Sequence, residues 1–313
     1  MSMRVRCDNP IISRRTAATF ALPTLVFVGV FLAFPALWAM YIGLTNLRLT
    51  GISAIQPRFV GFANFVSILR DSFFHNSLRI TAQFVLGSAL IGQLLLGLLL
   101  AVLLYNVKGP INDIVSSIVI LAWIIPEVVV AYLWVAFLDY DFGLLNVTRN
   151  LLGMPAVNWF FRHPVLSIIV FNTWRGTAFS MLLMGAALQT IPPSFLETAD
   201  VIGASEWRKF RDIMLPLIRP HMITNAVLIT IWTFNVFGPF LLTGGGPAFA
   251  TDLVSIYTYR NAFKYFKLGY GSAISTIILA TNLILAAVYM KLARRERTCP
   301  AMRHGCRVEG VLS

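Results

Sequence analysis

Glu127 and Arg175 are the only charged residues that lie away from the ends of the long apolar segments of this 313-residue sequence. A charge at bilayer depth is costly unless it is paired or hydrated, so such residues face the interior of a helix bundle or a water-filled cavity. The two residues fall at similar depths in consecutive segments of opposite direction, which allows them to pair. Two functions fit: an ion pair that orients two helices, or a pair that lines a cavity for a polar solute.

The apolar segment at 222–243 carries residues that interrupt a helix, namely Asn235, Gly238 and Pro239. A broken helix exposes backbone carbonyl and amide groups, which can bind a polar ligand within a membrane. Trp232 and Phe237 nearby could stack on the apolar face of a sugar ring, or could pack against other helices. We assign five residues to a substrate pathway: Glu127, Arg175, Trp232, Asn235 and Gly238.

No group of residues in the sequence has the composition of an enzyme or metal site. The histidines are scattered at loops and segment ends: His75, His163, His221 and His304. The three cysteines, Cys7, Cys299 and Cys306, lie in polar tails and match no zinc spacing. The glycine-rich turn at 244–246 is not followed by the Gly-Lys-Ser/Thr of a phosphate loop. We therefore predict no catalytic residue, no metal ligand and no ATP hydrolysis by this chain.

The composition is that of an integral membrane protein. Hydrophobic residues make up 58% of the chain, charged residues only 12%, and the mean hydropathy is +0.76. Soluble domains of this length have about twice that share of charged residues. The net charge of +12 comes from basic residues in short stretches beside the apolar segments, not from one patch. This distribution indicates membrane topology and argues against nucleic-acid binding.

Helices of about 20 residues cross a bilayer core about 30 Å thick. Six segments meet this requirement, near 20–44, 80–104, 114–138, 165–189, 222–243 and 271–292. We predict an all-α membrane protein of six spans, with polar tails at 1–19 and 293–313. Lys and Arg are more numerous on the side of the tails, which places both termini in the cytoplasm.

The second span carries small residues at four-residue spacing, Ser88 with Gly92 and Gly97 with Ala101. Such residues let helix backbones approach closely in lipid. We expect this helix to pack inside the bundle, although membrane helices are also rich in Gly and Ala in general.

The segment at 191–220 is polar and lies between two apolar spans. Ser194 and Glu197 have the spacing of a capping box, so we expect a short helix that begins near Phe195. Gly203 can adopt a positive φ and turn the chain. A second helix is expected from Ser205 to Pro216, where the proline ends it.

The second of these helices is amphipathic. Trp207, Phe210, Ile213 and Met214 fall on one face, with charged residues around the rest. Two short helices at an angle, with an apolar ridge, can dock into a groove on a partner protein. The alternative is an amphipathic helix that lies on the inner leaflet.

The spacing in this segment resembles the EAA loop of ABC-transporter permeases. Glu197, Thr198 and Ala199 are followed by Gly203 and, after nine residues, by the run 213–216. Thr198 stands where that motif usually has Ala, and Ile202 where it usually has Asp. The resemblance implies a cytoplasmic docking element for an ATPase subunit. It assigns the coupling role to Glu197, Thr198, Ala199, Gly203, Ala204, Trp207, Phe210, Ile213, Leu215 and Pro216.

The resemblance extends from about Phe59 to Ser275. The run 61–65 (Gly-Phe-Ala-Asn-Phe), the run 242–247 with Thr251, and the run 269–275 are similar to sugar-type permeases such as the maltose and glycerol-3-phosphate subunits. This implies a type I ABC importer permease, one half of a heterodimeric pore in the bacterial inner membrane. A second permease, two ATPase subunits that hold ATP and Mg, and an extracytoplasmic solute-binding protein would complete it. The chain itself would bind no cofactor, and the implied solute is a carbohydrate or polyol.

Two other classes of protein were weighed. A secondary transporter driven by an ion gradient would show internal repeats or acidic residues in several spans, and the spans contain only Glu127. A membrane enzyme would require a metal or nucleophile site, and no such grouping is found.

Overall fold

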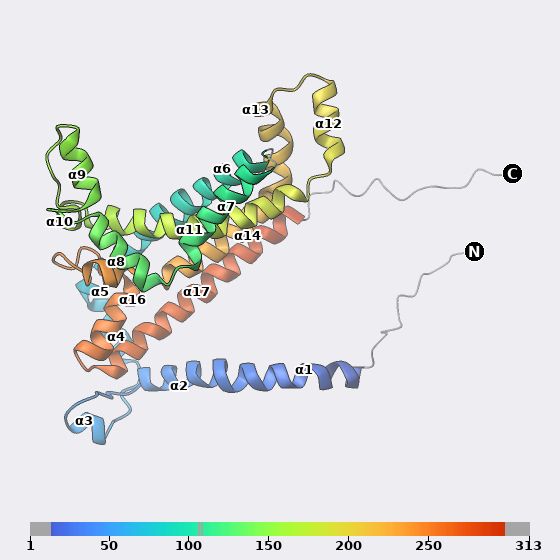
Figure 1. The fold of residues 1–313 in the computed structure, drawn as a ribbon. Helices are drawn as coiled ribbons and strands as arrows, with labels where there is room; N and C mark the ends of the chain where they lie inside the picture. The colour runs from blue at the N-terminus through green and yellow to red at the C-terminus, as the bar shows by residue number, and fades with distance from the viewer. Residues whose placement is uncertain (1–13, 106, 108, 298–313) are drawn as a thin grey trace, which may run out of the picture. The chain divides into compact units, whose positions relative to one another are not determined.

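The computed structural model describes residues 14–105, 107 and 109–297 (Figure 1). The described residues are helical and contain no β-strand, only an isolated bridge between Thr45 and Phe59. The chain divides into two compact units, one of 1–70 with 258–277 and one of 71–257 with 278–313. Cys7, Cys299, His304, Cys306 and nearly all of both predicted tails lie outside the described residues.

The first unit contains the N-terminal helical segment and the start of the last long helix. Its elements are α1 (Arg14–Val28), η1 (Gly29–Ala33), α2 (Phe34–Gly43), α3 (Ile52–Ile55), α4 (Ala63–Arg70), η4 (Arg260–Lys264) and the first turns of α17 (Leu268–Arg297). Gly269 allows close approach, because a Cβ there would lie 2.2 Å from the carbonyl oxygen of Thr45. The Asn64 amide donates to the carbonyls of Gly43 and Thr45, both at 2.8 Å. Asn64 of the 61–65 motif therefore satisfies backbone carbonyls at and just after the C-terminal end of α2.

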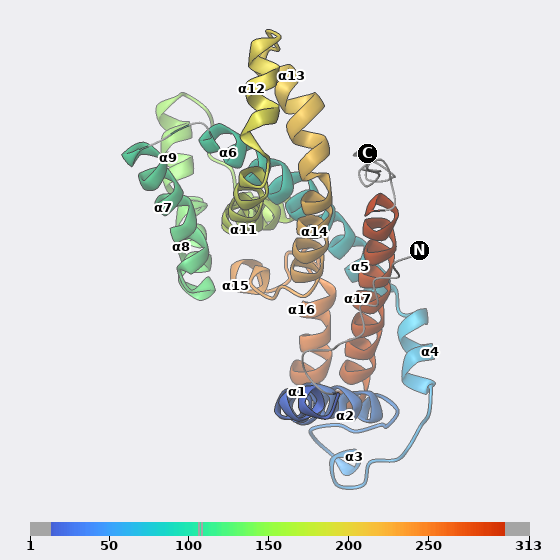
Figure 2. The same cartoon turned by 90° about the vertical axis from the view of Figure 1, so that its right-hand side faces the viewer.

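The second unit is a helix bundle around α11 (Pro164–Gln189), which contacts α6, α7, α14 and η2. The other elements are α5 (Ser72–Phe84), η2 (Val85–Gln93), α6 (Leu94–Tyr105), α7 (Pro110–Ile124), α8 (Glu127–Phe137), α9 (Leu144–Leu151), α10 (Trp159–Arg162), α12 (Pro193–Val201), α13 (Glu206–Lys209), η3 (Phe210–Met214), α14 (Leu215–Phe234), α15 (Pro239–Thr243), nearly all of α16 (Val254–Tyr259) and the rest of α17. Figure 1 shows α12 and α13 at one end of this bundle and α9 at the opposite end, and Figure 2 shows α11 nearly end-on among its neighbours.

Two apolar clusters pack against α11 at different heights. The Met184 cluster lies toward α12 and consists of Leu98, Ala101, Met181, Met184, Ala187, Leu188, Ile191, Met214 and Ile218. The Phe171 cluster lies toward the other end of α11 and consists of Val130, Ala131, Phe171 and Leu242. Residues 172–179 of α11 lie between the two clusters along the helix.

The packing expected for the second span is confirmed. A Cβ at Gly92 would lie 2.2 Å from Thr173 Oγ1, and a Cβ at Gly97 would lie 2.4 Å from Ser180 Cβ. Ser88 is fully buried. The small residues therefore let this helix approach α11 closely, as the spacing indicated.

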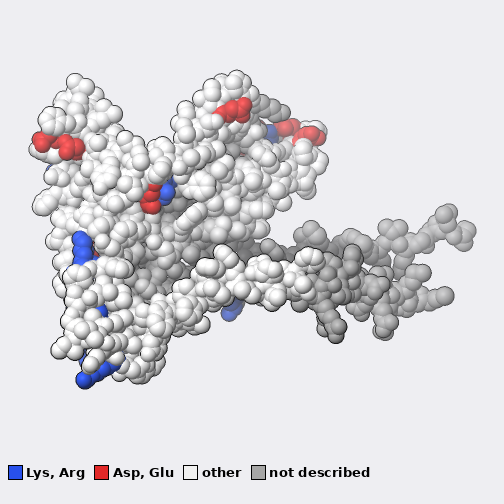
Figure 3. Space-filling model, turned by 60° about the horizontal axis from the view of Figure 1, so that its bottom comes forward, with Lys and Arg blue, Asp and Glu red and all other residues white. Residues whose placement is uncertain are grey.

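Five helices are long and apolar enough to cross a membrane: Thr19–Gly43, Ser72–Tyr105, Pro164–Gln189, Glu206–Phe234 and Leu268–Lys291. The bent pair Pro110–Ile124 and Glu127–Phe137 makes a sixth if it is one span. On the face in Figure 3, charged atoms form small separate groups on a broad uncharged surface. Six segments therefore lie where the sequence predicted spans, although several helices extend beyond the predicted limits.

The segment predicted as one span at 114–138 is not one continuous helix, because its two helices meet at 102°. Pro126 has no N–H for helix continuation and forces the preceding Ile125 into extended backbone, with φ −60° and ψ 135°. The predicted interruption of the 222–243 segment is confirmed, since α14 ends at Phe234 and α15 begins at Pro239.

Candidate functional site

A cavity of about 400 Å³ lies in the second unit where the two broken helices face α11. The break between α7 and α8 borders it, and so does the break between α14 and α15. Four residues of the predicted substrate pathway line it: Glu127, Arg175, Trp232 and Asn235. Five further residues that were not predicted from the sequence also line it: Gln93, Trp123, Asn172, Phe179 and Thr233.

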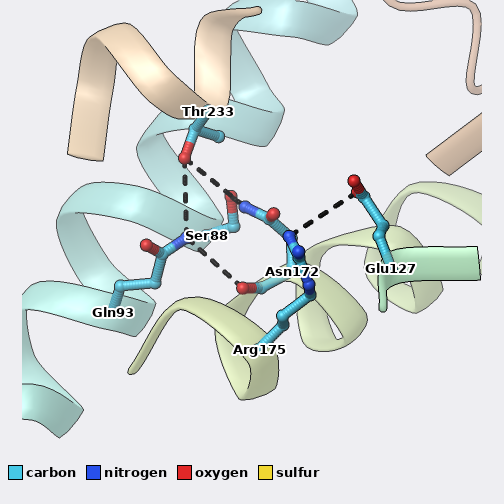
Figure 4. A network of polar contacts seen from close by, with 6 residues as sticks. All are labelled: Ser88, Gln93, Glu127, Asn172, Arg175 and Thr233. Carbon is cyan, nitrogen blue, oxygen red and sulfur yellow. Dashed lines mark hydrogen bonds and ion pairs between the residues drawn. The ribbon is translucent and has the colours of Figure 1, made fainter. Parts of the chain in front are cut away.

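Glu127 and Arg175 form a loose ion pair in the cavity wall (Figure 4). Arg175 Nη1 lies 3.7 Å from Glu127 Oε1, which is too long for a hydrogen bond. Among the described residues, neither Glu127 Oε1 nor Arg175 Nε has a hydrogen-bond partner, although both atoms are buried. The predicted pairing is confirmed, and it leaves one acceptor and one donor available to a polar solute.

The local sequence explains the position of Glu127. It is the first residue of α8, directly after the break that Pro126 imposes. Gly238, in the other break, approaches it so closely that a Cβ there would lie 1.9 Å from Glu127 Oε1. Gly238 therefore borders the site through Glu127, and any side chain at that position would displace the carboxylate.

Three aromatic rings form another part of the cavity wall. Trp232 meets Phe179 edge-on, with ring centroids 5.3 Å apart, and meets Trp123 edge-on at 6.2 Å. Trp232 is 55% exposed, so it is not a packed core residue. An open indole face beside polar groups can stack on the apolar face of a sugar ring, which is one of the two roles predicted for Trp232.

Behind the cavity lies a buried polar network (Figure 4). The Gln93 amide donates to the Asn172 carbonyl at 3.3 Å, and the Asn172 amide donates to Ser88 Oγ at 2.9 Å. Both amides also reach Thr233 Oγ1 at 3.5 Å. A Cβ at Gly176 would lie 2.2 Å from Gln93 Oε1, so a glycine is required for Gln93 to reach α11. The network joins η2, α11 and α14 at the level of the cavity.

Asn235 follows the last residue of α14 and holds the end of that helix. Its amide donates to the Ile231 carbonyl at 2.6 Å, and its Oδ1 accepts from the Asn282 amide of α17 at 3.0 Å. A second polar contact, between Thr230 and Tyr289 at 3.3 Å, joins the same two helices. These contacts fix one edge of the cavity.

Gln93 and Asn172 could have been found from the sequence, since each is a polar residue within an apolar span. Buried amides in a membrane bundle need partners, which is a signal of an interior position. Trp123 and Phe179 carried no such signal, because aromatic residues are common throughout these spans. Trp123 reaches the cavity at the end of α7, directly before the bend at Pro126, whereas Phe179 lies on α11.

The ten residues assigned to coupling lie in and beside two short helices, α12 and α13, at the other end of the bundle. Gly203 has φ +74°, as predicted. The Ala204 N–H donates to the Ala199 carbonyl at 2.9 Å and the Gly203 N–H to the Asp200 carbonyl at 3.0 Å, the pattern of a Schellman turn. Buried Lys209 forms ion pairs with Asp200 and Glu206, which ties α13 to α12 across this turn.

The expected start of the first of these helices is wrong. It begins at Pro193, with Pro192 as the capping residue and no side-chain cap, so Ser194 and Glu197 do not form a capping box. A proline is well suited to the first position of a helix, because its fixed φ and missing N–H cost nothing there. Ser205 does cap α13, accepting from the Arg208 N–H at 3.4 Å.

The expected end of the second helix at Pro216 is also wrong. The helix passes through a wide turn, η3, in which the Leu215 N–H donates to the Phe210 carbonyl five residues earlier. The hydrogen bonds are thereby shifted by one residue just before Pro216, which has no N–H to donate, and α14 continues to Phe234. The coupling segment and the fifth span thus form one continuous helix.

The predicted apolar ridge is split between the bundle and the surface. Met214 is buried in the Met184 cluster, and Phe210 and Leu215 pack against it. Trp207 is 67% exposed, whereas Ile213 is half-buried. Glu197, Thr198 and Pro216 are exposed, Ala204 is half-buried and Ala199 is buried. A rigid pair of helices therefore presents Trp207 and the Gly203 turn outward.

An all-α bundle of apolar spans with a polar, aromatic cavity between two broken helices defines a membrane transport protein for a polar solute. The family model described as the binding-protein-dependent transport system inner membrane component matches residues 93–298, and the chain belongs to this family. It is thus a permease subunit of a binding-protein-dependent ABC importer and a multi-pass membrane protein. No group of metal-binding side chains occurs among the described residues.

Relatives are similar over nearly the whole chain. The sulfoquinovosyl glycerol transport system permease protein SmoG of Agrobacterium fabrum is 31% identical, over 90% of this chain and 92% of that protein. The trehalose/maltose transport system permease protein MalF of Thermococcus litoralis is 34% identical, over 88% and 92%. A crystal structure of a bacterial ABC transporter for the acidic polysaccharide alginate matches with a TM-score of 0.76 at 23% identity, over 89% and 95%. The last similarity establishes the type I permease fold.

Proposed function

We propose that this chain forms half of a translocation pathway for a carbohydrate or polyol, and that the cavity beside Glu127 and Arg175 contacts the solute. The observation that carries the proposal is the pairing of an exposed Trp232 face with a buried acceptor and a buried donor that lack hydrogen bonds. Sugars present an apolar ring face and hydroxyl groups that both donate and accept. The named relatives transport trehalose, maltose or sulfoquinovosyl glycerol, which supports this solute class.

The same proposal includes the rest of the transporter. A second permease forms the other half of the pathway, two ATPase subunits bind ATP and Mg, and an extracytoplasmic protein delivers the solute. The solved alginate transporter in complex with a pentasaccharide-bound periplasmic protein supports this assembly. In this arrangement both termini and the 191–220 segment lie in the cytoplasm, and α9 lies on the outer side.

The 191–220 segment is proposed as the element that an ATPase subunit grips. Its two helices are held rigidly by the Schellman turn and by Lys209, and they expose Ile202 and Trp207. Because the second helix continues into α14, a displacement at Trp207 is transmitted along one helix to Asn235 at the cavity. This continuity supports mechanical coupling between ATP hydrolysis and the pathway.

Uptake by the reconstituted complex tests the solute class and the energy source. Proteoliposomes that contain this chain, its partner permease and its ATPase are given labelled maltose, trehalose, glycerol or glycerol 3-phosphate with the binding protein. We expect uptake of at least one of them that needs both internal ATP and the binding protein. Uptake that instead follows an imposed ion gradient without ATP would refute the proposal and indicate a secondary transporter.

Crosslinking tests the coupling element. After the native cysteines are replaced by serine, Ile202→Cys is expected to crosslink to a cysteine on the ATPase subunit, and the yield should change with bound nucleotide. Leu151→Cys, at the opposite end of the bundle, is the matched control and should give no such product. Labelling of Ile202→Cys by an impermeant reagent from the outer side would contradict the assigned orientation.

A further inference from the structure

Helix α9 exposes large apolar side chains on one face, beside the exposed Thr148 and Asn150, and buries an amide on the opposite side. Leu144 and Leu151, one face of the helix, are 63% and 82% exposed, and Val147 between them is exposed as well. Asn146 on the other side is fully buried. A helix beside water normally buries its leucines and exposes its amides. The surroundings of α9 are therefore apolar on the side of Leu144 and Leu151.

Hydrogen bonds of Asn146 fix this orientation. Its amide donates to the carbonyls of Asp139 at 3.0 Å, Tyr140 at 3.3 Å and Val157 at 3.0 Å. Its Oδ1 accepts from the Val157 N–H at 3.0 Å and from Trp159 Nε1 at 3.3 Å. The helix cannot turn its leucines inward without breaking this set of five partly buried hydrogen bonds.

The apolar face continues onto neighbouring parts of the molecule. Phe142 before the helix and Leu152 after it are 89% and 69% exposed. Helix α8, which contacts α9 and belongs to the bent third span, exposes Val129 and Leu133. The exposed side of a membrane span faces lipid, so the surface of α9 joins a surface that is already in the bilayer.

The geometry and charge of α9 also fit lipid. Its eight residues extend only about 12 Å, too short to cross a core of about 30 Å. Figure 1 shows that it lies crosswise to α11, at the end of the bundle away from α12 and α13. The segment 139–163 carries two aspartates and two arginines, so it presents no strong net charge that would select a charged protein partner.

We propose that α9 is an interfacial helix that inserts Leu144, Val147 and Leu151 among the lipid acyl chains at the bundle end opposite α12 and α13. The Asn146 hydrogen bonds hold it there as a fixed part of the bent third span. Lipid that contacts α9 also helps to hold α8 in position. Glu127 of the cavity is the first residue of α8.

Nitroxide accessibility tests this proposal in the full chain. The native cysteines are replaced by serine, and spin labels are placed at Leu151→Cys, at Val147→Cys and, as controls, at Asn150→Cys of the same helix and at Leu133→Cys on α8. The transport complex is reconstituted in lipid nanodiscs, and collision rates with oxygen and with a water-soluble nickel chelate are measured. We expect the oxygen-to-nickel ratio at 147 and 151 to approach that at 133 and to exceed that at 150 severalfold.

The outcomes separate lipid from other occupants. A ratio at 151 equal to that at 150 would mean a wet surface and would overturn the proposal. Low collision rates with both reagents at 147 and 151 would mean contact with protein and would overturn it as well. Addition of the solute-binding protein is expected to leave the ratio unchanged, and a loss of both collision rates on its addition would assign the face to that protein instead.

Discussion

Gly238→Ala adds one carbon atom, the Cβ, and this atom is expected to displace the Glu127 carboxylate in the cavity wall. A Cβ at this position would lie 1.9 Å from Glu127 Oε1, whereas ordinary contacts begin at 3.4 Å, so the carboxylate must retreat by about 1.5 Å. Extra atoms in a packed site cost about 1–3 kcal/mol. At about 1.4 kcal/mol per factor of ten, uptake of the wild-type solute is expected to fall by about fivefold to a hundredfold.

The assay is ATP-dependent uptake by reconstituted vesicles, together with the apparent melting temperature of the purified chain. Gly185→Ala is the matched control, because a Cβ at Gly185 meets nothing within 4 Å, and it should change neither quantity. Glu127→Asp combined with Gly238→Ala shortens the carboxylate side chain by one methylene and should recover part of the loss. Wild-type uptake in Gly238→Ala, or a loss that Glu127→Asp does not relieve, would refute the reasoning.

Three further predictions concern packing, the α9 loop and the ion pair. Gly97→Ala places a Cβ 2.4 Å from Ser180 Cβ and should destabilise the bundle by about 1–3 kcal/mol, seen as a lower melting temperature than that of the control Gly185→Ala. Asn146→Ala removes five hydrogen bonds, so trypsin should cut the 139–163 loop much faster, and unchanged cleavage would contradict its role. Arg175→Gln and Glu127→Gln each leave one charge unpaired and should reduce uptake more than the double variant does; full uptake in both single variants would exclude a role for the pair.

The sequence predicted a structural feature correctly where a single local property of the residues determines that feature. Apolar length predicted the positions of the five long apolar helices and of the bent pair, and Gly203 predicted the turn that the structure shows with positive φ. The pairing of Glu127 with Arg175 also followed, since two lone charges at similar depths in apolar surroundings have few alternatives. These features depend on local composition and on the cost of an unpaired charge.

The sequence did not predict the features that depend on competing interactions of neighbouring residues. Pro126 and Pro216 are both prolines in helical surroundings, yet one breaks its helix by 102° and the other is carried through by a wide turn. Which outcome occurs depends on how the preceding hydrogen bonds can rearrange and on the packing of each helix, and the spacing of residues does not record this. Of the three aromatic rings in the cavity wall, Trp232 was predicted, whereas Trp123 was missed for the same reason, because it lies directly before the bend at Pro126.

The apolar clusters around Met184 and Phe171 hold the bundle by shape, whereas the layer between them is held by the directional bonds of Gln93, Asn172 and Thr233. Amides and hydroxyls can exchange partners after a small rotation of a helix, but interlocked aliphatic chains cannot. The cluster of Val85, Ala89, Ile229 and Phe234 packs at the same level, so a rotation of one helix there would exchange hydrogen-bond partners and also repack this cluster. A solute in the cavity would contact the layer in which both changes occur.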